Sequence, residues 1–304
     1  MSLVVPLLDG LSLALAGDLD GGADGDGGPA PGFATGRLAR GLLLRDGERE
    51  LAEEGVGFGV PILKRGLQTI FPGRLSLVKR GVAGERSITA VFHMDLVERL
   101  AAPGSPSLSS PALYTAKNAL AALHRRVPVL RGPLTGLSSA LRRSFGWVTT
   151  FEEAGEGFTL ALTYIVAGER LTVAVDATAL PADGATSVVV MNEQGARAFD
   201  RYCDLAGAEL RGAAIGTWDE VTAPGASFVC EERRVAFTLG QVAGARLFRG
   251  RELIGSRVAW AGFGYTFPAA LGAIAYELRI ERLPASAWAA ASDDLGVAGT
   301  TVAP

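Results

Sequence analysis

The alternation of hydrophobic and polar positions predicts β-strands over most of this chain. The clearest case is the segment 158–166, whose apolar side chains occupy every second position: Phe158, Leu160, Leu162, Tyr164 and Val166. The tripeptide Ala167-Gly168-Glu169 then reverses the chain into a second alternating run at Leu171, Val173 and Val175. A period of two places neighbouring side chains on opposite faces of a sheet. These two segments are therefore predicted to pair as a hairpin.

The same pattern recurs near both ends of the sequence. The opening segment 3–15 is strand-like and is interrupted by Asp9-Gly10, and 33–100 contains several apolar runs separated by glycine-containing turns. In 274–281 the apolar residues alternate with alanine and charged residues, which predicts a strand with one exposed face. Successive strands joined by short turns indicate antiparallel pairing.

The middle of the chain has a different period. A linker rich in proline and serine, 101–111, precedes the segment 112–126, where apolar residues recur every three or four positions. That spacing is typical of a helix, and a second short helix is expected over 134–143. A short helical insertion is therefore predicted at about 111–145.

The predicted fold class is mainly β, as a large antiparallel β-sandwich or supersandwich. We expect a single domain over 1–283, whose halves 1–100 and 146–283 are joined by the insertion 101–145. The remaining segment, 284–304, is rich in alanine, serine and threonine, has no period, and is expected to be a weakly structured tail.

Composition narrows the classes of function. The 304 residues include 29 Lys+Arg and 32 Asp+Glu, and this near-neutral balance argues against a nucleic-acid-binding protein. No apolar run approaches the roughly 20 residues of a membrane span, and no secretory leader is apparent, so we expect a cytoplasmic protein. Two histidines and two cysteines are too few for a structural zinc site, and no phosphate-binding glycine motif occurs. Neither a metal nor a cofactor is expected.

One candidate catalytic site lies in the first half of the chain. If the apolar residues of 88–96 face the core, His93 and Asp95 share the opposite face, about 6.5–7 Å apart. An imidazole beside a carboxylate suits general acid–base chemistry. The nearby strand Gly55–Gly59 carries glycine at alternate positions, which leaves room for a ligand or for a neighbouring element. Glu54, which precedes this strand, completes the predicted catalytic set.

A candidate substrate-binding set lies in the second half. Trp218, Trp260 and Tyr265 have rings that could stack on the C–H face of a sugar, and Asp219 follows Trp218 directly. The polar run Asn192–Gly195 comes after a buried-type strand and is interpreted as a loop, where functional residues tend to occur.

The many-stranded antiparallel pattern resembles the supersandwich proteins that include galactose mutarotases and the β-domains of polysaccharide lyases. The resemblance spans nearly the whole chain and rests on architecture, because the His-x-Tyr-Phe-Asn segment of mutarotases has no match here. It implies a carbohydrate-handling protein that binds or modifies a sugar on a concave sheet face. The alternatives are a non-catalytic binding or scaffold module, and a β-fold enzyme acting on an apolar small molecule such as a terpenoid. The expected partner is a small-molecule or saccharide ligand.

Overall fold

The protein is mainly β, as the alternation predicts. The computed structural model describes residues 3–15, 38–66, 68–80, 87–101, 148–254 and 258–284. The strands before the insertion are β1 (Leu3–Pro6), β2 (Leu11–Leu15), β3 (Leu42–Asp46), β4 (Arg49–Glu50), β5 (Gly57–Arg65), β6 (Gln68–Arg80) and β7 (Ser87–Ala101). Those of the following part are β8 (Val148–Ala167), β9 (Arg170–Asp176), β10 (Thr186–Gln194), β11 (Arg201–Asp204), β12 (Glu209–Arg211), β13 (Asp219–Glu220), β14 (Gly225–Cys230), β15 (Val235–Gly240), β16 (Arg246–Ile254), β17 (Val258–Pro268) and β18 (Ala273–Arg282). The 3-10 helices in the described residues are η3 (Gly212–Ile215) and η4 (Ala269–Leu271).

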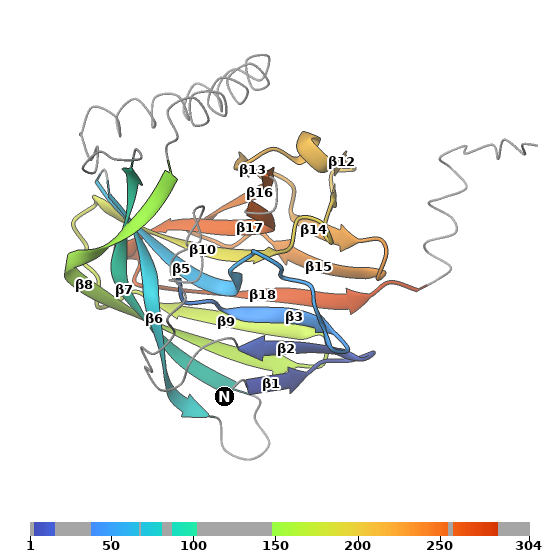
Figure 1. Cartoon of the computed structure of the whole chain (residues 1–304), viewed down its shortest axis with the longest axis horizontal. Coiled ribbons are helices and arrows are strands. Elements are labelled where there is room, and N and C mark those ends of the chain that lie inside the picture. Colours follow the sequence, from blue (N-terminus) through green and yellow to red (C-terminus); the bar gives the residue numbers. More distant parts are fainter. Residues whose placement is uncertain are drawn as a thin grey trace, which may run out of the picture.

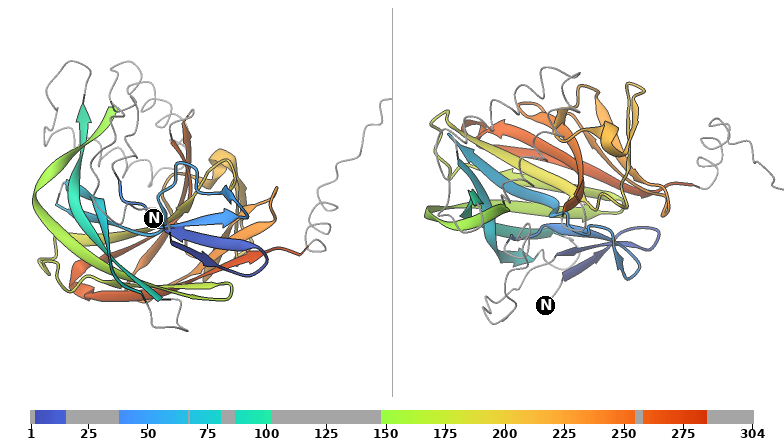
Figure 2. Two further views of the ribbon diagram at one scale, coloured as in Figure 1. Left: turned by 60° about the horizontal axis from the view of Figure 1, so that its bottom comes forward. Right: turned by 45° about the horizontal axis from the view of Figure 1, so that its top comes forward.

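Hydrogen bonding joins all of these strands into one antiparallel sheet (Figure 1). Strand β5 is a branch point of the sheet. One of its edges pairs with β10 along most of its length. Its other edge is shared by β6 at Leu63–Arg65 and by β3 at Phe58. The long strands β6, β7 and β8 curve around one end of the molecule (Figure 2). The layers expected as two sheets are thus parts of one continuous sheet that encloses a single core.

The core is formed by the side chains that the alternation selects. In β8 the residues Leu160, Leu162, Tyr164 and Val166 are buried, and in β18 every second residue from Ile274 to Ile280 is buried while its neighbours are exposed. Strands β8 and β9 pair as the predicted hairpin. Burial of one face is what favours this register, since a shift by one residue would expose the whole apolar set.

Two predictions on domain organisation concern residues that the structure does not describe. The insertion 101–145 and the tail 284–304 lie outside the described residues, apart from Ala101 and Pro284. The single-domain assignment over 1–283 therefore stays a prediction.

Candidate functional site

Strands β10, β17 and β16 carry an unusual set of residues on the face that points away from the core. Cross-strand pairing places Glu193 of β10 opposite Gly262 of β17, and Gly262 opposite Gly250 of β16. Two pairs further along β16 and β17, and so on the same face, Glu252 lies opposite Trp260. Directly opposite residues of an antiparallel pair project to the same side of the sheet. The three strands therefore present two carboxyl groups and an indole around two glycines.

Aromatic rings lie across the glycines of this face. A Cβ atom at Gly250 would be only 2.7 Å from Cη2 of Trp260, and a Cβ at Gly264 would collide with the ring of Trp218. Trp218 stacks in parallel on Phe248, with ring centroids 5.6 Å apart, and meets Trp260 edge to face at 6.5 Å. Any side chain at Gly250 or Gly264 would displace these rings. We call the set Trp218, Phe248, Trp260, Glu252 and Glu193 the tryptophan face.

The two carboxyl groups of the tryptophan face have different surroundings. Glu252 is half-buried and accepts a hydrogen bond from the indole N–H of Trp260 at 3.2 Å, which fixes the ring beside the carboxylate. Glu193 is only 6% exposed, and the backbone N–H of Val56 donates to its Oε1 atom at 3.3 Å. Burial raises the pKa of Glu193 to about 7; the Val56 hydrogen bond lowers it, the charge of Glu252 raises it, and Arg40 lowers it. Glu193 is therefore partly protonated near neutral pH.

Arg40 holds the turn that covers one side of Glu193. Its guanidinium donates to the carbonyl oxygens of Glu53 and Gly55 at 2.9 Å each, and forms an ion pair with Glu50 at 2.9 Å. These contacts fix the chain that enters β5 and therefore position the N–H of Val56. Because three acceptors share its charge, Arg40 offsets only part of the cost of burying Glu193.

A buried hydrogen-bond network on the opposite face supports β10. The Oδ1 atom of Asn192 accepts from the hydroxyl of Tyr276 at 2.9 Å and from the N–H of Gly59 at 3.1 Å, while the hydroxyl of Tyr164 donates to the carbonyl of Gly59 at 2.8 Å. Desolvation raises the pKa of Tyr276, so its hydroxyl stays a donor. This network fixes Asn192 and, through it, the adjacent Glu193.

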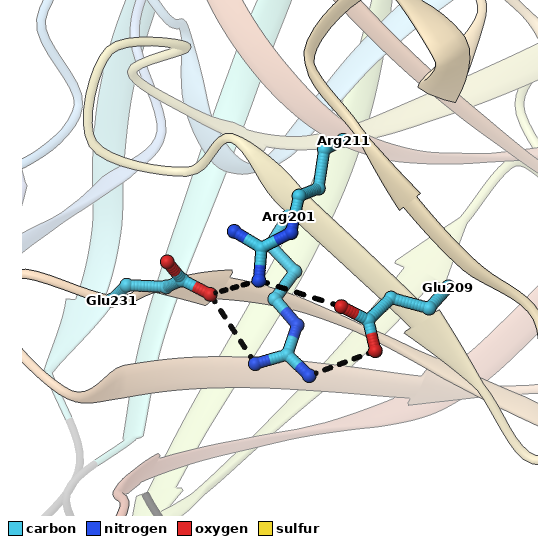
Figure 3. Close-up of polar contacts among 4 residues, drawn as sticks. All are labelled: Arg201, Glu209, Arg211 and Glu231. Atoms are coloured by element: carbon cyan, nitrogen blue, oxygen red, sulfur yellow. Dashed lines mark hydrogen bonds and ion pairs between the residues drawn. The ribbon is translucent and has the colours of Figure 1, made fainter. Parts of the chain in front are cut away.

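An ion-pair network anchors the chain that leads to Trp218 (Figure 3). Arg201 and Arg211 each contact both Glu209 and Glu231, and the shortest of the four contacts joins Arg211 to Glu231 at 2.6 Å. The hydrogen bond from Arg211 lowers the pKa of Glu231. These residues tie β11, β12 and β14 together, and β12 continues directly into η3 and the Trp218 segment. The network therefore stabilises the base of that segment.

We expect Arg211→Met to lower the free energy of unfolding by no more than about 1 kcal/mol, because partly exposed ion pairs contribute little. Urea denaturation at low salt measures this loss. In about 1 M salt the difference from wild type should shrink, since ions screen the network. A loss of several kcal/mol that persists at high salt would show that Arg211 acts through packing instead.

The predicted catalytic residues are divided between two places. His93 lies on β7 with its Nε2 atom 2.9 Å from the hydroxyl of Ser76, and Asp95 forms an ion pair with Arg74 at 2.9 Å. Their neighbours Phe92 and Met94 are fully buried, as the alternation predicts. Glu54 is exposed in the turn before β5, and its neighbours Glu53 and Gly55 lie against Gly195 and Gln194 at the end of β10.

The glycines of the segment 55–59 make room for the protein itself. A Cβ atom at Gly59 would be 2.5 Å from the ring of Tyr164, and one at Gly55 would be 2.9–3.0 Å from the backbone of Ala52 and Gln194. The sequence left two interpretations of these glycines, room for a ligand or room for a neighbouring element. The neighbouring element accounts for both Gly55 and Gly59.

The predicted substrate-binding residues lie on two faces of the sheet. Trp218 and Trp260 both belong to the tryptophan face and are half-buried. Tyr265 projects from the other face of β17, is fully buried against Tyr276, and donates a hydrogen bond to the carbonyl of Gly240. Asp219 is 8% exposed in β13 and lies opposite Arg249 in the pairing of β13 with β16. The structure brings the two tryptophans together and separates Tyr265 from them.

Three residues of the tryptophan face, Glu193, Phe248 and Glu252, were not among the predicted site residues. Glu193 lies in a polar run that the sequence suggested to be a loop, but β10 extends through Gln194 because β5 and β17 pair with both of its edges. The Oε1 atom of Gln194 also accepts from the N–H of Leu44 at 3.2 Å. Glu252 carried no local signal, since its significance comes from Trp260 on the neighbouring strand.

Two further observations concern the described residues alone. We find no helix with the length and hydropathy needed to span a membrane. The described histidine, cysteine, aspartate and glutamate residues form no group of three or more that could hold a metal ion.

Comparison with known proteins gives structural neighbours only. No protein-family model matches the sequence, and no curated protein matches it. An alpha-N-acetylgalactosaminidase of Bifidobacterium bifidum aligns with 97% of this chain at 10% identity and a TM-score of 0.48. An alpha-mannosidase of Enterococcus faecalis V583 aligns with 96% of this chain at 9% identity and a TM-score of 0.44. This chain spans 39% and 30% of their respective lengths. The Slr1438 protein of Synechocystis sp. PCC 6803 aligns with 93% of this chain, over 96% of its own length, at 9% identity and a TM-score of 0.38. Two of these three proteins are carbohydrate-active enzymes.

Proposed function

We propose that this protein binds or modifies a carbohydrate on the tryptophan face. The observation that carries the proposal is the grouping of two indole rings with two carboxyl groups on one side of β10, β16 and β17. An indole ring offers an apolar surface to the C–H face of a sugar. Carboxylate oxygens accept hydrogen bonds from hydroxyl groups, and a protonated carboxyl also donates one. The tryptophan face combines both kinds of contact.

The rigidity of this face supports the proposal. Trp260 is held by its hydrogen bond to Glu252 and by its close approach to Gly250, and Trp218 is held by Phe248 and Gly264. A ring that is already fixed loses little side-chain entropy when a ligand binds, so more of the contact energy appears as affinity.

Trp260→Leu is expected to weaken saccharide binding by about fivefold or more, because it removes a ring face worth at least about 1 kcal/mol. Isothermal titration calorimetry with a panel of mono- and oligosaccharides measures the affinity. His93→Ala is the matched comparison, since it removes the residue on which the site predicted from sequence depends. If His93→Ala abolishes binding and Trp260→Leu does not, the site is at His93, Asp95 and Glu54 and our location is wrong.

Thermal shift separates carbohydrate handling from the alternative of an apolar ligand. A saturating ligand of the native state raises the melting temperature by mass action. We expect saccharides to produce this shift and terpenoid or acyl compounds not to do so. The reverse result would contradict the proposal, whereas a shift by saccharides without any conversion of them would identify a binding module.

A further inference from the structure

Two arginine side chains of this protein lie between an aromatic ring and a carboxylate, one of them at Phe248 of the tryptophan face. The guanidinium of Arg246 lies 5.1 Å from the ring centroid of Phe248 and forms an ion pair with Glu220. Arg65 lies 5.5 Å from the ring centroid of Phe158 and contacts Glu156 at 3.3 Å. A cation is attracted both by the negative face of a ring and by a nearby carboxylate.

The tryptophan face has the same ring and carboxylate, and it adds a second acid. The carboxylate of Glu252 is joined to the edge of the Trp260 ring by a hydrogen bond, and its charge acts on the buried carboxyl of Glu193. Like charges that face each other repel, and burial strengthens this repulsion. A positive charge placed between Glu252 and the face of Trp260 would relieve it.

We propose that the preferred ligand of the tryptophan face carries a positive charge, and that it is a saccharide with a free amino group. This inference rests on the proposed carbohydrate function and names its substrate class. The sugar ring stacks on an indole while its ammonium group lies within reach of Glu252 and the face of Trp260. An acidic sugar is disfavoured at the same place, because its carboxylate meets two acids and Arg40 is already bound to Glu50 and two carbonyl oxygens.

The test compares sugars that differ at one substituent. Glucose, galactose and mannose are each titrated together with their 2-amino and 6-carboxylate analogues at neutral pH. In at least one series the amino sugar should bind about tenfold more tightly than the parent hexose, and the uronic acid more weakly than the parent. The preference should fall as salt is added, since ions screen the charge.

Glu252→Gln isolates the origin of the preference. Glutamine keeps an oxygen that can accept from Trp260 but removes the charge, so the affinity ratio of amino sugar to parent should fall to about twofold or less. Glu156→Gln is the matched control, because Glu156 is paired with Arg65 beside Phe158, outside the tryptophan face, and it should keep the wild-type ratio.

The outcomes distinguish this inference from the proposed function. If parent and amino sugars bind equally, and both depend on Trp260, the carbohydrate function stands and the charge preference is wrong. If no sugar binds, tetramethylammonium is titrated instead. Binding that is lost in Glu252→Gln and Trp260→Leu supports a cation site and contradicts the carbohydrate assignment, and absence of binding overturns both.

Discussion

Glu193→Gln is expected to stabilise the protein at alkaline pH, by an amount that disappears in acid. Burial raises the pKa of Glu193 from 4.5 to about 7. Between these values the folded protein keeps a proton that the unfolded chain has released, so the contribution of Glu193 to stability is greatest below pH 4.5. It declines as pH rises and is fully lost above about pH 7. The difference between the two pKa values corresponds to about 3 kcal/mol of unfolding free energy.

Urea denaturation from pH 4.5 to pH 8 measures this effect as the difference in unfolding free energy between Glu193→Gln and wild type. Glutamine has the size of the protonated acid and keeps an oxygen that can accept from Val56, but it cannot ionise. The variant should therefore be about 3 kcal/mol more stable than wild type at pH 8 and nearly equal to it at pH 4.5. Glu54→Gln, at an exposed position, should follow the wild-type curve. Parallel curves for Glu193→Gln and wild type would show that Glu193 is ionised without penalty.

The fold was predictable from the sequence because the relevant signal is local. In β18, four apolar residues at alternate positions were enough to indicate which face is buried, and the structure confirms all four. In β7 the burial of Ile88, Ala90, Phe92 and Met94 follows the alternation for the same reason. A strand repeats every two residues, so a short segment already contains its own burial pattern.

The candidate site was less predictable because it depends on the register between distant strands. Glu193 and Gly262 are neighbours only because β10 pairs with β17, and Glu252 meets Trp260 only through the pairing of β16 with β17. A period of two says nothing about which residues of another strand lie opposite. The two tryptophans were predicted from residue type alone, whereas their acidic neighbours required the pairing.

The strand beside Glu193 also contains an irregularity that no local pattern indicates. The pairing of β10 with β5 shifts register between Met191 and Asn192, and Gly59 of β5 lies in this region. Gly59 is the extra residue of this bulge, since β10 pairs with β17 without any shift. The bulge brings the N–H of Gly59 to the Oδ1 atom of Asn192, the neighbour of Glu193.

Gly59→Ala is therefore expected to be among the most destabilising single-methyl substitutions in this protein. Gly59 has a φ of 74°, which alanine adopts only at a cost of about 1 kcal/mol, and its new Cβ would be 2.5 Å from the buried ring of Tyr164. Overpacking of a buried site adds about 1–3 kcal/mol, so the total loss should be about 2–4 kcal/mol. Gly66→Ala is the matched control, because Gly66 also has a positive φ, of 57°, but no atom lies within 4 Å of the position that its new Cβ would occupy. It should lose only about 1 kcal/mol. Equal losses in the two variants, measured by urea denaturation, would show that the Tyr164 ring yields freely and that Gly59 does not fix the strand carrying Glu193.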